Sequence, residues 1–172
     1  MITDRPSQRE ASGAIAELPA QLAGDALIDG QSPQAERYLI DWGRDRCGSA
    51  RFIVRPGSVE DVQAFVRWCS QSGIAIVVQG GNTGLAGGAI PDNSDYAVLS
   101  LERLNRIRRV DPLDFTLQAD AGAVLQDVKD AAEASEMTFP LALGAQGSCT
   151  IGGNVATNAG GINVLRYGMT RD

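Results

Sequence analysis

Hydrophobic residues recur with a helical period in the segment between Ser58 and Gly73. The apolar positions that fall on one face of this helix are Val62, Phe65, Val66 and Cys69. Ser58 followed by Asp61 has the form of a capping box, which satisfies backbone N–H groups at the start of a helix. Gly73 can adopt the left-handed conformation with which many helices end. The pattern therefore predicts a helix between Ser58 and Gly73.

Continuous apolar runs predict β-strands on either side of this helix. Residues 51–55 (RFIVR) favour a strand that ends at Pro56, and residues 74–78 (IAIVV) are typical of a strand buried on both faces. The order is therefore a strand, a helix and a second strand, and this second strand leads directly into the glycine-rich residues 80–88. Further strands are predicted at 96–101, 107–110 and 115–121, with a short one at 137–143.

Other helices are predicted near the N-terminus and after Gly122. The helix after Gly122 carries Leu125, Val128, Ala131 and Ala132 on its apolar face. Weaker helical signals lie at 14–22, and Ser32 can cap a helix that begins at Pro33 and continues to about Ile40. We expect an N-terminal helical segment over 1–50, followed by a second region over 51–172 that contains the clearer strands and helices.

Two segments, 80–88 (GGNTGLAGG) and 144–161 (GAQGSCTIGGNVATNAGG), hold eleven of the twenty glycines. Such clustering suits backbone that turns with φ > 0 or presses against a ligand, and we expect Gly81 and Gly84 to adopt φ > 0. Consecutive exposed N–H groups form nests that favour anions, above all phosphates. The two segments therefore predict two halves of one site for a phosphorylated cofactor. The alternative is glycine-rich internal loops that bind nothing.

Composition narrows the classes of partner. The chain has 172 residues, a net charge of −6 and Lys129 as its single lysine, which argues against binding to a nucleic-acid backbone. The N-terminal residues contain no apolar stretch of the kind found in secretory signals, so a cytoplasmic protein is expected. Residues 137–165 contain no charge but are rich in Gly, Asn, Thr and Ser, so no transmembrane segment is predicted.

Several kinds of catalytic and metal site are excluded by residue type. The chain contains neither the GxGxxG dinucleotide motif nor a Walker A motif, and it has no histidine. A Ser-His-Asp triad, a Cys-His dyad and histidine metal sites are therefore impossible within it. The cysteines, Cys47, Cys69 and Cys149, are odd in number and lack CxxC spacing. We therefore predict reduced thiols, no metal site and no catalytic residue in this chain.

The order of the motifs resembles a known family. VVQGGNTGLAGGAIPD, LSLERLNRIRRVD and PLALGAQGSCTIGGNVATNAGGINVLRYGMTRD resemble the flavin-binding domain of the FAD-linked oxidase family that includes vanillyl-alcohol oxidase. Within it they are most similar to D-lactate, glycolate and D-2-hydroxyglutarate dehydrogenases. The resemblance runs from about Arg51 to the C-terminus. It implies an α/β (α+β) fold of the vanillyl-alcohol oxidase type, with two subdomains and FAD between them.

The resemblance also implies which residues bind FAD. The first segment would wrap the pyrophosphate, the second would run beside the adenosine and pyrophosphate, and the last would lead towards the isoalloxazine ring. In that order the residues are Gly80, Gly81, Asn82, Thr83, Gly84 and Leu85; Pro140, Gly144, Ser148, Gly152 and Gly153; and Thr157, Asn158, Gly160 and Gly161. Some relatives attach flavin through a histidine; this chain has none, so non-covalent FAD is expected.

The family domain continues beyond RYGMTRD and is followed by a substrate domain, so the resemblance implies an N-terminal piece with an incomplete second subdomain. In the hydroxy-acid dehydrogenases that the chain resembles, the histidines and arginines that hold the substrate carboxylate and accept the substrate's proton lie largely in that missing part. The leading hypothesis is the FAD-binding portion of an oxidoreductase that moves a hydride from the α-carbon of a D-2-hydroxy acid to flavin. A non-catalytic flavin-binding subunit of an oxidase complex is the alternative, and a reductase of a nucleotide-sugar enol ether fits the motifs less well. The specific hydroxy acid, the electron acceptor and the oligomeric state stay open.

Overall fold

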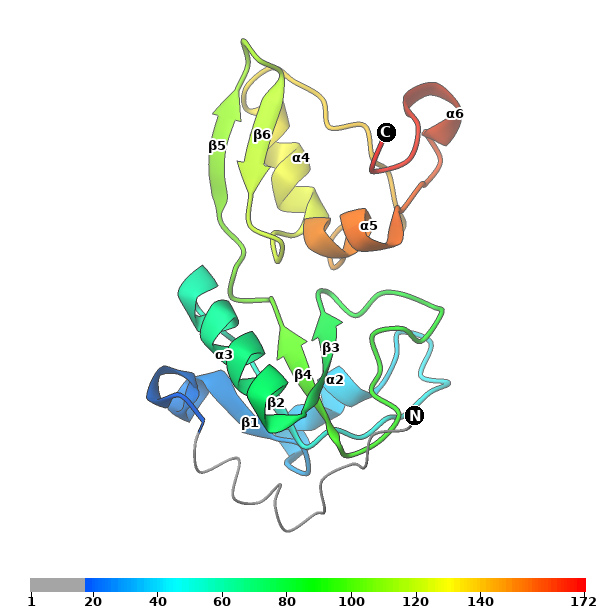
Figure 1. The fold of residues 1–172 in the computed structure, drawn as a ribbon. Helices are drawn as coiled ribbons and strands as arrows, with labels where there is room; N and C mark the ends of the chain where they lie inside the picture. Colours follow the sequence, from blue (N-terminus) through cyan, green and yellow to red (C-terminus); the bar gives the residue numbers. More distant parts are fainter. Residues whose placement is uncertain (1–17) are drawn as a thin grey trace, which may run out of the picture. The chain divides into compact units, whose positions relative to one another are not determined.

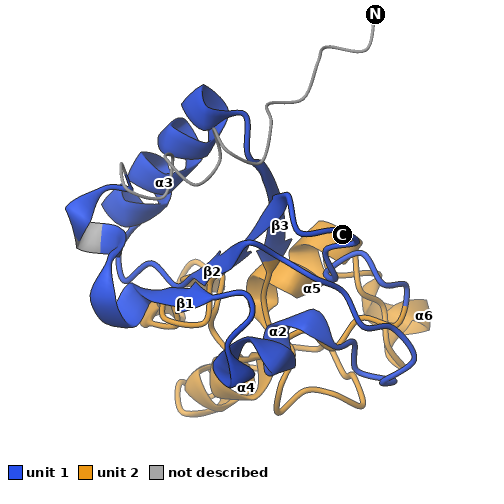
Figure 2. Cartoon of the chain, turned by 90° about the horizontal axis from the view of Figure 1, so that it is seen from below, with its two compact units in different colours: residues 1–78, 86–100 blue, residues 79–85, 101–172 orange. Residues whose placement is uncertain are grey.

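A computed structural model describes residues 18–172 and divides them into two compact units. Unit 1 holds the described residues up to Val78 together with Ala86–Ser100, and unit 2 holds Gln79–Leu85 and Leu101–Asp172 (Figure 2). The helical signal at 14–22 therefore lies partly outside the described residues. No described helix is both long enough and apolar enough to cross a membrane.

Unit 1 is built on a four-stranded sheet with the order β1-β2-β4-β3 (Figure 1). Its strands are β1 (Leu27–Asp29), β2 (Phe52–Val54), β3 (Ala75–Gln79) and β4 (Tyr96–Ser100). β1 pairs with β2 in the antiparallel sense, and β2 pairs with β4 in parallel, with Ile53 opposite Val98. The strands predicted at 51–55 and 96–101 are thus confirmed, and their central residues form the core of the sheet.

The predicted helix is α3 (Val59–Ser72), and both of its ends match the prediction. The Ser58 hydroxyl accepts a hydrogen bond from the Asp61 N–H at 3.1 Å, and Gly73 caps the C-terminus with φ 66°. Phe65, Trp68 and Cys69 are buried, whereas Val66 is 43% exposed. The buried face of α3 is therefore rotated slightly about the helix axis from the predicted face. Trp68, rather than Val66, packs beside Phe65 and against Phe52.

The prediction that residues 74–78 form a strand buried on both faces is wrong in its burial. β3 forms as expected, but it is the edge strand of the sheet, and Val78 is 56% exposed. β4 is instead the strand covered on both faces, with Ala97, Val98 and Leu99 buried. The central run YAVLSL is less apolar than the edge run IAIVV, so the apolar pattern alone does not identify which strand is central.

The described part of the N-terminal segment is less helical than expected. It contains the 3₁₀ turns η1 (Ala20–Leu22), η2 (Gly24–Ala26) and η3 (Pro33–Ala35), the strand β1, and one turn of helix, α2 (Glu36–Leu39). β1 joins the sheet because Ile28 packs in one core cluster with Tyr38 and Ile53. The division of the chain at residue 50 stays a prediction.

Unit 2 contains a β-hairpin and three helices. β5 (Ile107–Asp111) and β6 (Thr116–Ala119) pair in the antiparallel sense, which confirms the strands predicted there. α4 (Leu125–Glu133) is the helix predicted after Gly122, and it buries Leu125, Val128 and Ala132. α5 (Ile151–Thr157) and α6 (Val164–Tyr167) follow.

The strand predicted at 137–143 does not form. The segment is irregular and makes a single bridge, from Ala142 to Gly161. Its apolar pattern arises because Phe139, Leu141 and Leu143 pack in a cluster with Leu125 on α4. Pro140, which has no N–H group to donate to a strand, interrupts the segment.

Candidate functional site

The first glycine segment is divided between the two units. Residues 79–85 belong to unit 2, and 86–88 belong to unit 1, where the Arg46 side chain lies over Gly87. The left-handed residues of the segment are Asn82 (φ 51°) and Gly87 (φ 78°). The expectation that Gly81 and Gly84 adopt φ > 0 is therefore wrong: Asn82 makes the turn, because asparagine tolerates this conformation.

Positions 80 and 81 require glycine because the backbone there lies very close to the second glycine segment. A β-carbon on residue 80 would overlap the hydroxyl oxygen of Thr150, and one on residue 81 would overlap the carbonyl oxygen of Ser148. Gly84, by contrast, has open space at the corresponding position. The structure thus brings the two glycine segments together within unit 2, at 80–81 and 148–150.

The turn that follows carries unengaged donors. Within residues 18–172, the N–H groups of Gly81, Thr83, Gly84 and Leu85 have no hydrogen-bond acceptor. Gly84 and Leu85 are exposed, and Leu85 is 74% exposed. Neighbouring N–H groups without acceptors around an Asn82 turn have the character of an anion nest.

The second glycine segment is not an open loop throughout, since α5 occupies its middle. A β-carbon on Gly152 would lie 2.6 Å from the Ala121 β-carbon, so this glycine allows α5 to approach the end of β6. The N–H groups of Ile151 and Gly152 donate to the carbonyl oxygens of Ala123 and Ala121, at 2.9 and 2.8 Å. The expectation of exposed N–H groups is therefore wrong at these two positions, which serve packing.

Residues 144–149 are held by α4. The N–H groups of Leu125 and Gln126 donate to the carbonyl oxygens of Cys149 and Gln146, both at 2.9 Å. The Lys129 ammonium donates to Gln146 Oε1 at 3.1 Å. Lys129 thus supports the glycine segment, whereas Gly144 and Ser148 are exposed.

A second cluster contains Pro140 and the C-terminal end of the segment. Gly161 (φ 86°) lies directly against the Ala142 carbonyl, and Asn163 Nδ2 donates to the Pro140 carbonyl at 2.8 Å. Asn158 ends α5 in the left-handed conformation, with φ 50°. The Thr157 hydroxyl donates to the Gly153 carbonyl at 2.8 Å. The contacts therefore join predicted residues at two places in unit 2, one at Gly80 and Gly81 and one at Gly161.

Two buried polar side chains lie outside the set of residues that the resemblance assigns to FAD. Thr150 is 5% exposed and Asn154 is 4% exposed, and within the described residues Thr150 Oγ1 and Asn154 Oδ1 have no hydrogen-bond partner. Buried polar atoms of this kind are rare and mark places where a ligand or water completes the hydrogen bonding. Thr150 is the N-cap residue of α5, and its carbonyl accepts the Asn154 N–H at 2.9 Å. A threonine at the start of a helix with an asparagine four residues later is the sequence signal that could have added both to that set.

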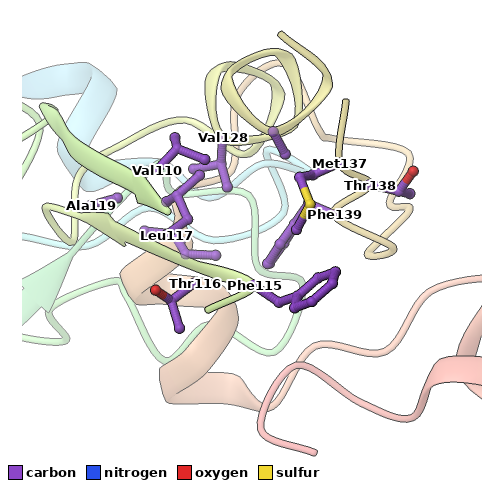
Figure 3. A pocket seen from close by; sticks show the side chains of 11 residues that line it. Val110, Phe115, Thr116, Leu117, Ala119, Val128, Met137, Thr138 and Phe139 are labelled. Atoms are coloured by element: carbon purple, nitrogen blue, oxygen red, sulfur yellow. The ribbon is translucent and has the colours of Figure 1, made fainter. Parts of the chain in front are cut away.

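Unit 2 also contains a cavity of about 240 Å³ between the β5–β6 hairpin, α4 and α5 (Figure 3). Nine of its eleven lining residues are apolar, among them Leu117, Val128, Met137 and Phe139, and the other two are Thr116 and Thr138. None of the predicted FAD-binding residues lines it. The residues that line it include no Lys or Arg that could neutralise a phosphate.

The cysteines differ in their environments. Cys47 is exposed, whereas Cys69 and Cys149 are buried. Burial raises the pKa of the Cys69 thiol from 9.0 to about 12, which keeps it protonated and unreactive. Among the described residues, no group of three or more His, Cys, Asp or Glu side chains is placed to hold a metal ion.

Comparisons with known proteins identify a family for most of the chain. The model of the "FAD binding domain" family matches residues 50–172. D-2-hydroxyglutarate dehydrogenase of Xanthomonas citri pv. viticola is 49% identical over 156 residues, which are 90% of this chain and 33% of that protein. The mitochondrial D-2-hydroxyglutarate dehydrogenase of Danio rerio is 42% identical over 166 residues, 96% of this chain and 31% of that protein. The chain thus spans about a third of the length of these relatives.

Among solved structures, an alkyldihydroxyacetonephosphate synthase has a TM-score of 0.81 and a sequence identity of 20%. The match covers all of this chain and 33% of the synthase chain. A second structure, 6-hydroxy-D-nicotine oxidase from Arthrobacter nicotinovorans, has a TM-score of 0.71 and a sequence identity of 22%. This match covers 89% of this chain and 33% of the oxidase chain. At such low identity these likenesses show the fold alone.

Proposed function

The chain belongs to the FAD binding domain family, and we propose that it forms the FAD-binding portion of a dehydrogenase of D-2-hydroxy acids. The family and the vanillyl-alcohol oxidase type of fold that the sequence resemblance implies are thereby confirmed. The substrate class is proposed because the similar proteins of Xanthomonas citri pv. viticola and Danio rerio are named D-2-hydroxyglutarate dehydrogenases.

The observation that carries the proposal is the set of free N–H groups at Gly81, Thr83, Gly84 and Leu85. The two phosphates of FAD carry negative charge and need such donors. The turn at residues 80–88 contains no carboxylate that would repel them. The contact of Gly80 and Gly81 with residues 148–150 sets the base of the nest. The residues present therefore fit a dinucleotide cofactor.

We assign the remaining predicted residues by their surroundings. Gly152 serves close packing, and Pro140, Gly144, Ser148 and Gly153 lie in or beside the segments that run along the proposed cofactor site. We propose that the turn formed by Thr157, Asn158, Gly160 and Gly161 faces the flavin ring, where polar groups tune its electron affinity. Non-covalent attachment of FAD is part of the proposal.

Bound FAD supplies an acceptor for the hydride that leaves the α-carbon of a hydroxy acid. This chain's own part is to hold and orient the cofactor through backbone donors. It has no histidine, and we assign it no catalytic residue. The sequence favours the cytoplasm as the compartment, although the relatives of Danio rerio and Bos taurus are named mitochondrial.

The test uses the protein at its natural length. We expect purified protein to carry FAD, and D-2-hydroxyglutarate, D-lactate or glycolate to bleach the visible absorbance of the oxidised flavin. The L enantiomer of 2-hydroxyglutarate is the matched control and should leave the absorbance unchanged. A protein that neither carries nor rebinds FAD would overturn the proposal. Retained FAD without bleaching by any D-2-hydroxy acid would overturn only the substrate class.

A further inference from the structure

The turn at the end of α5 is held from a second segment of unit 2, residues 168–172. The backbone N–H of Thr170 donates to the Ala159 carbonyl at 2.9 Å, and the Thr170 hydroxyl donates to the same oxygen at 2.5 Å. The next residue continues the contact, since the Arg171 N–H donates to Asn158 Oδ1 at 3.0 Å. Two consecutive residues of the turn are thus fixed by two consecutive residues near the C-terminus.

The shapes of both partners make this contact specific. Asn158 is in the left-handed conformation, which directs the chain out of α5 and towards the glycines that follow. Gly168 also has positive φ, 78°, and the Met169 N–H donates to the Asp172 carboxylate at 2.7 Å, which closes segment 168–172 into a compact loop. Gly160 packs beside this loop, because a β-carbon there would lie 2.9 Å from Met169 Sδ.

The opposite side of the turn is fixed as well, since Gly161 lies against the Ala142 carbonyl and forms a bridge with residue 142. Asn158 Oδ1 is therefore engaged within the protein, and its role is to shape the turn. The Ala159 carbonyl accepts two hydrogen bonds from a single residue, so loss of the Thr170 hydroxyl removes one constraint while the backbone bond remains.

We propose that Thr170 is a positioning residue: its hydroxyl fixes the Asn158–Gly161 turn in the geometry that the flavin ring requires, without contacting the flavin. This inference rests on the proposed function of that turn. A neutral hydrogen bond contributes about 1 kcal/mol, which corresponds to roughly a fivefold change in an equilibrium constant. Substitution of Thr170 should change the affinity and the spectrum of bound flavin by reshaping the turn.

The experiment compares three variants of the protein at natural length. Thr170→Val keeps the shape of the side chain but not the hydroxyl, Thr170→Ser restores the hydroxyl, and Thr138→Val removes an exposed hydroxyl of the same unit as a control. We expect a roughly fivefold higher FAD dissociation constant and an altered visible spectrum for Thr170→Val. Thr170→Ser and Thr138→Val should match the parent. A Thr170→Val protein equal to the parent, or no rescue by serine, would overturn the inference.

Hydrogen exchange on the parent protein keeps the inference testable if Thr170→Val does not fold. The amides of Thr170 and Arg171 should be protected, because both donate within the turn contact. Free exchange of these two amides in the folded protein would overturn the inference. A parent that binds no FAD would instead refute the proposed function, and the exchange measurement would still report on the contact itself.

Discussion

The hydroxyl oxygen of Thr150 occupies the space that a β-carbon on residue 80 would fill, so Gly80 and Thr150 fit together only because residue 80 has no side chain. This contact joins two segments that lie about seventy residues apart in the sequence. It places the base of the proposed phosphate nest against α5. The relationship also makes a steric prediction that does not depend on any ligand.

Gly80→Ala should destabilise the protein by about 1–3 kcal/mol, because the added methyl group overpacks this contact. Thr150→Ala should relieve the clash, since the Thr150 β-carbon itself lies 3.5 Å from the added position, an ordinary contact distance. The double variant should therefore be more stable than Gly80→Ala alone. Chemical denaturation of the parent, both single variants and the double variant measures this coupling. Additive effects of the two substitutions would contradict the contact.

The helix α3 and the strands β2 and β4 could be predicted from the sequence because local chemistry determines them. The capping pair Ser58 and Asp61 and the terminal Gly73 act within a few residues. The exposure of β3 could not be predicted in this way. It depends on which strand lies beside it, and an apolar run such as IAIVV carries no information about its neighbours.

The candidate site shows the same limit. The two glycine segments could be predicted to meet, since both have the composition of phosphate loops. The reason for each glycine could not, because it depends on a distant partner: Ser148 for Gly81 and Ala121 for Gly152. Helix α5 was missed because two adjacent glycines lower helix propensity, and packing against Ala121 outweighs that preference.

The thiols should differ sharply in reactivity. At pH 8 the folded protein should react rapidly at Cys47, which is exposed, while Cys69 and Cys149 react only after unfolding. Burial raises the pKa of Cys69 from 9.0 to about 12, so its contribution to stability is complete below pH 9 and is lost as the pH rises towards 12. Alkylation followed by peptide mass spectrometry identifies the labelled residue. Rapid labelling of Cys69 in folded protein would contradict its burial.

Any flavin in this protein should be released by denaturation. The chain has no histidine to form a tether, and of its three thiols Cys69 and Cys149 are buried. Acid precipitation of the flavin-loaded protein at natural length should leave a colourless pellet and a yellow supernatant. Peptide mapping of residues 1–172 is the matching check, and a flavin-modified peptide from this region would show covalent attachment instead.

Substitutions at Gly84 should separate cofactor binding from folding. The φ angle of Gly84 is not positive, and a β-carbon added to this residue would have no neighbouring atom within 4 Å. Both Gly84→Ala and Gly84→Val should therefore fold with nearly the parent stability. The valine side chain would stand beside the free N–H groups of Thr83, Gly84 and Leu85 and hinder the approach of a phosphate. FAD affinity should fall at least about tenfold for Gly84→Val, or roughly 1.4 kcal/mol, and less for Gly84→Ala.

Gly81→Ala is the contrast, because its β-carbon would collide with the Ser148 carbonyl and reduce stability as well. Fluorescence titration with FAD, paired with thermal unfolding, measures both quantities, and unchanged affinity in a well-folded Gly84→Val protein would place the phosphates elsewhere.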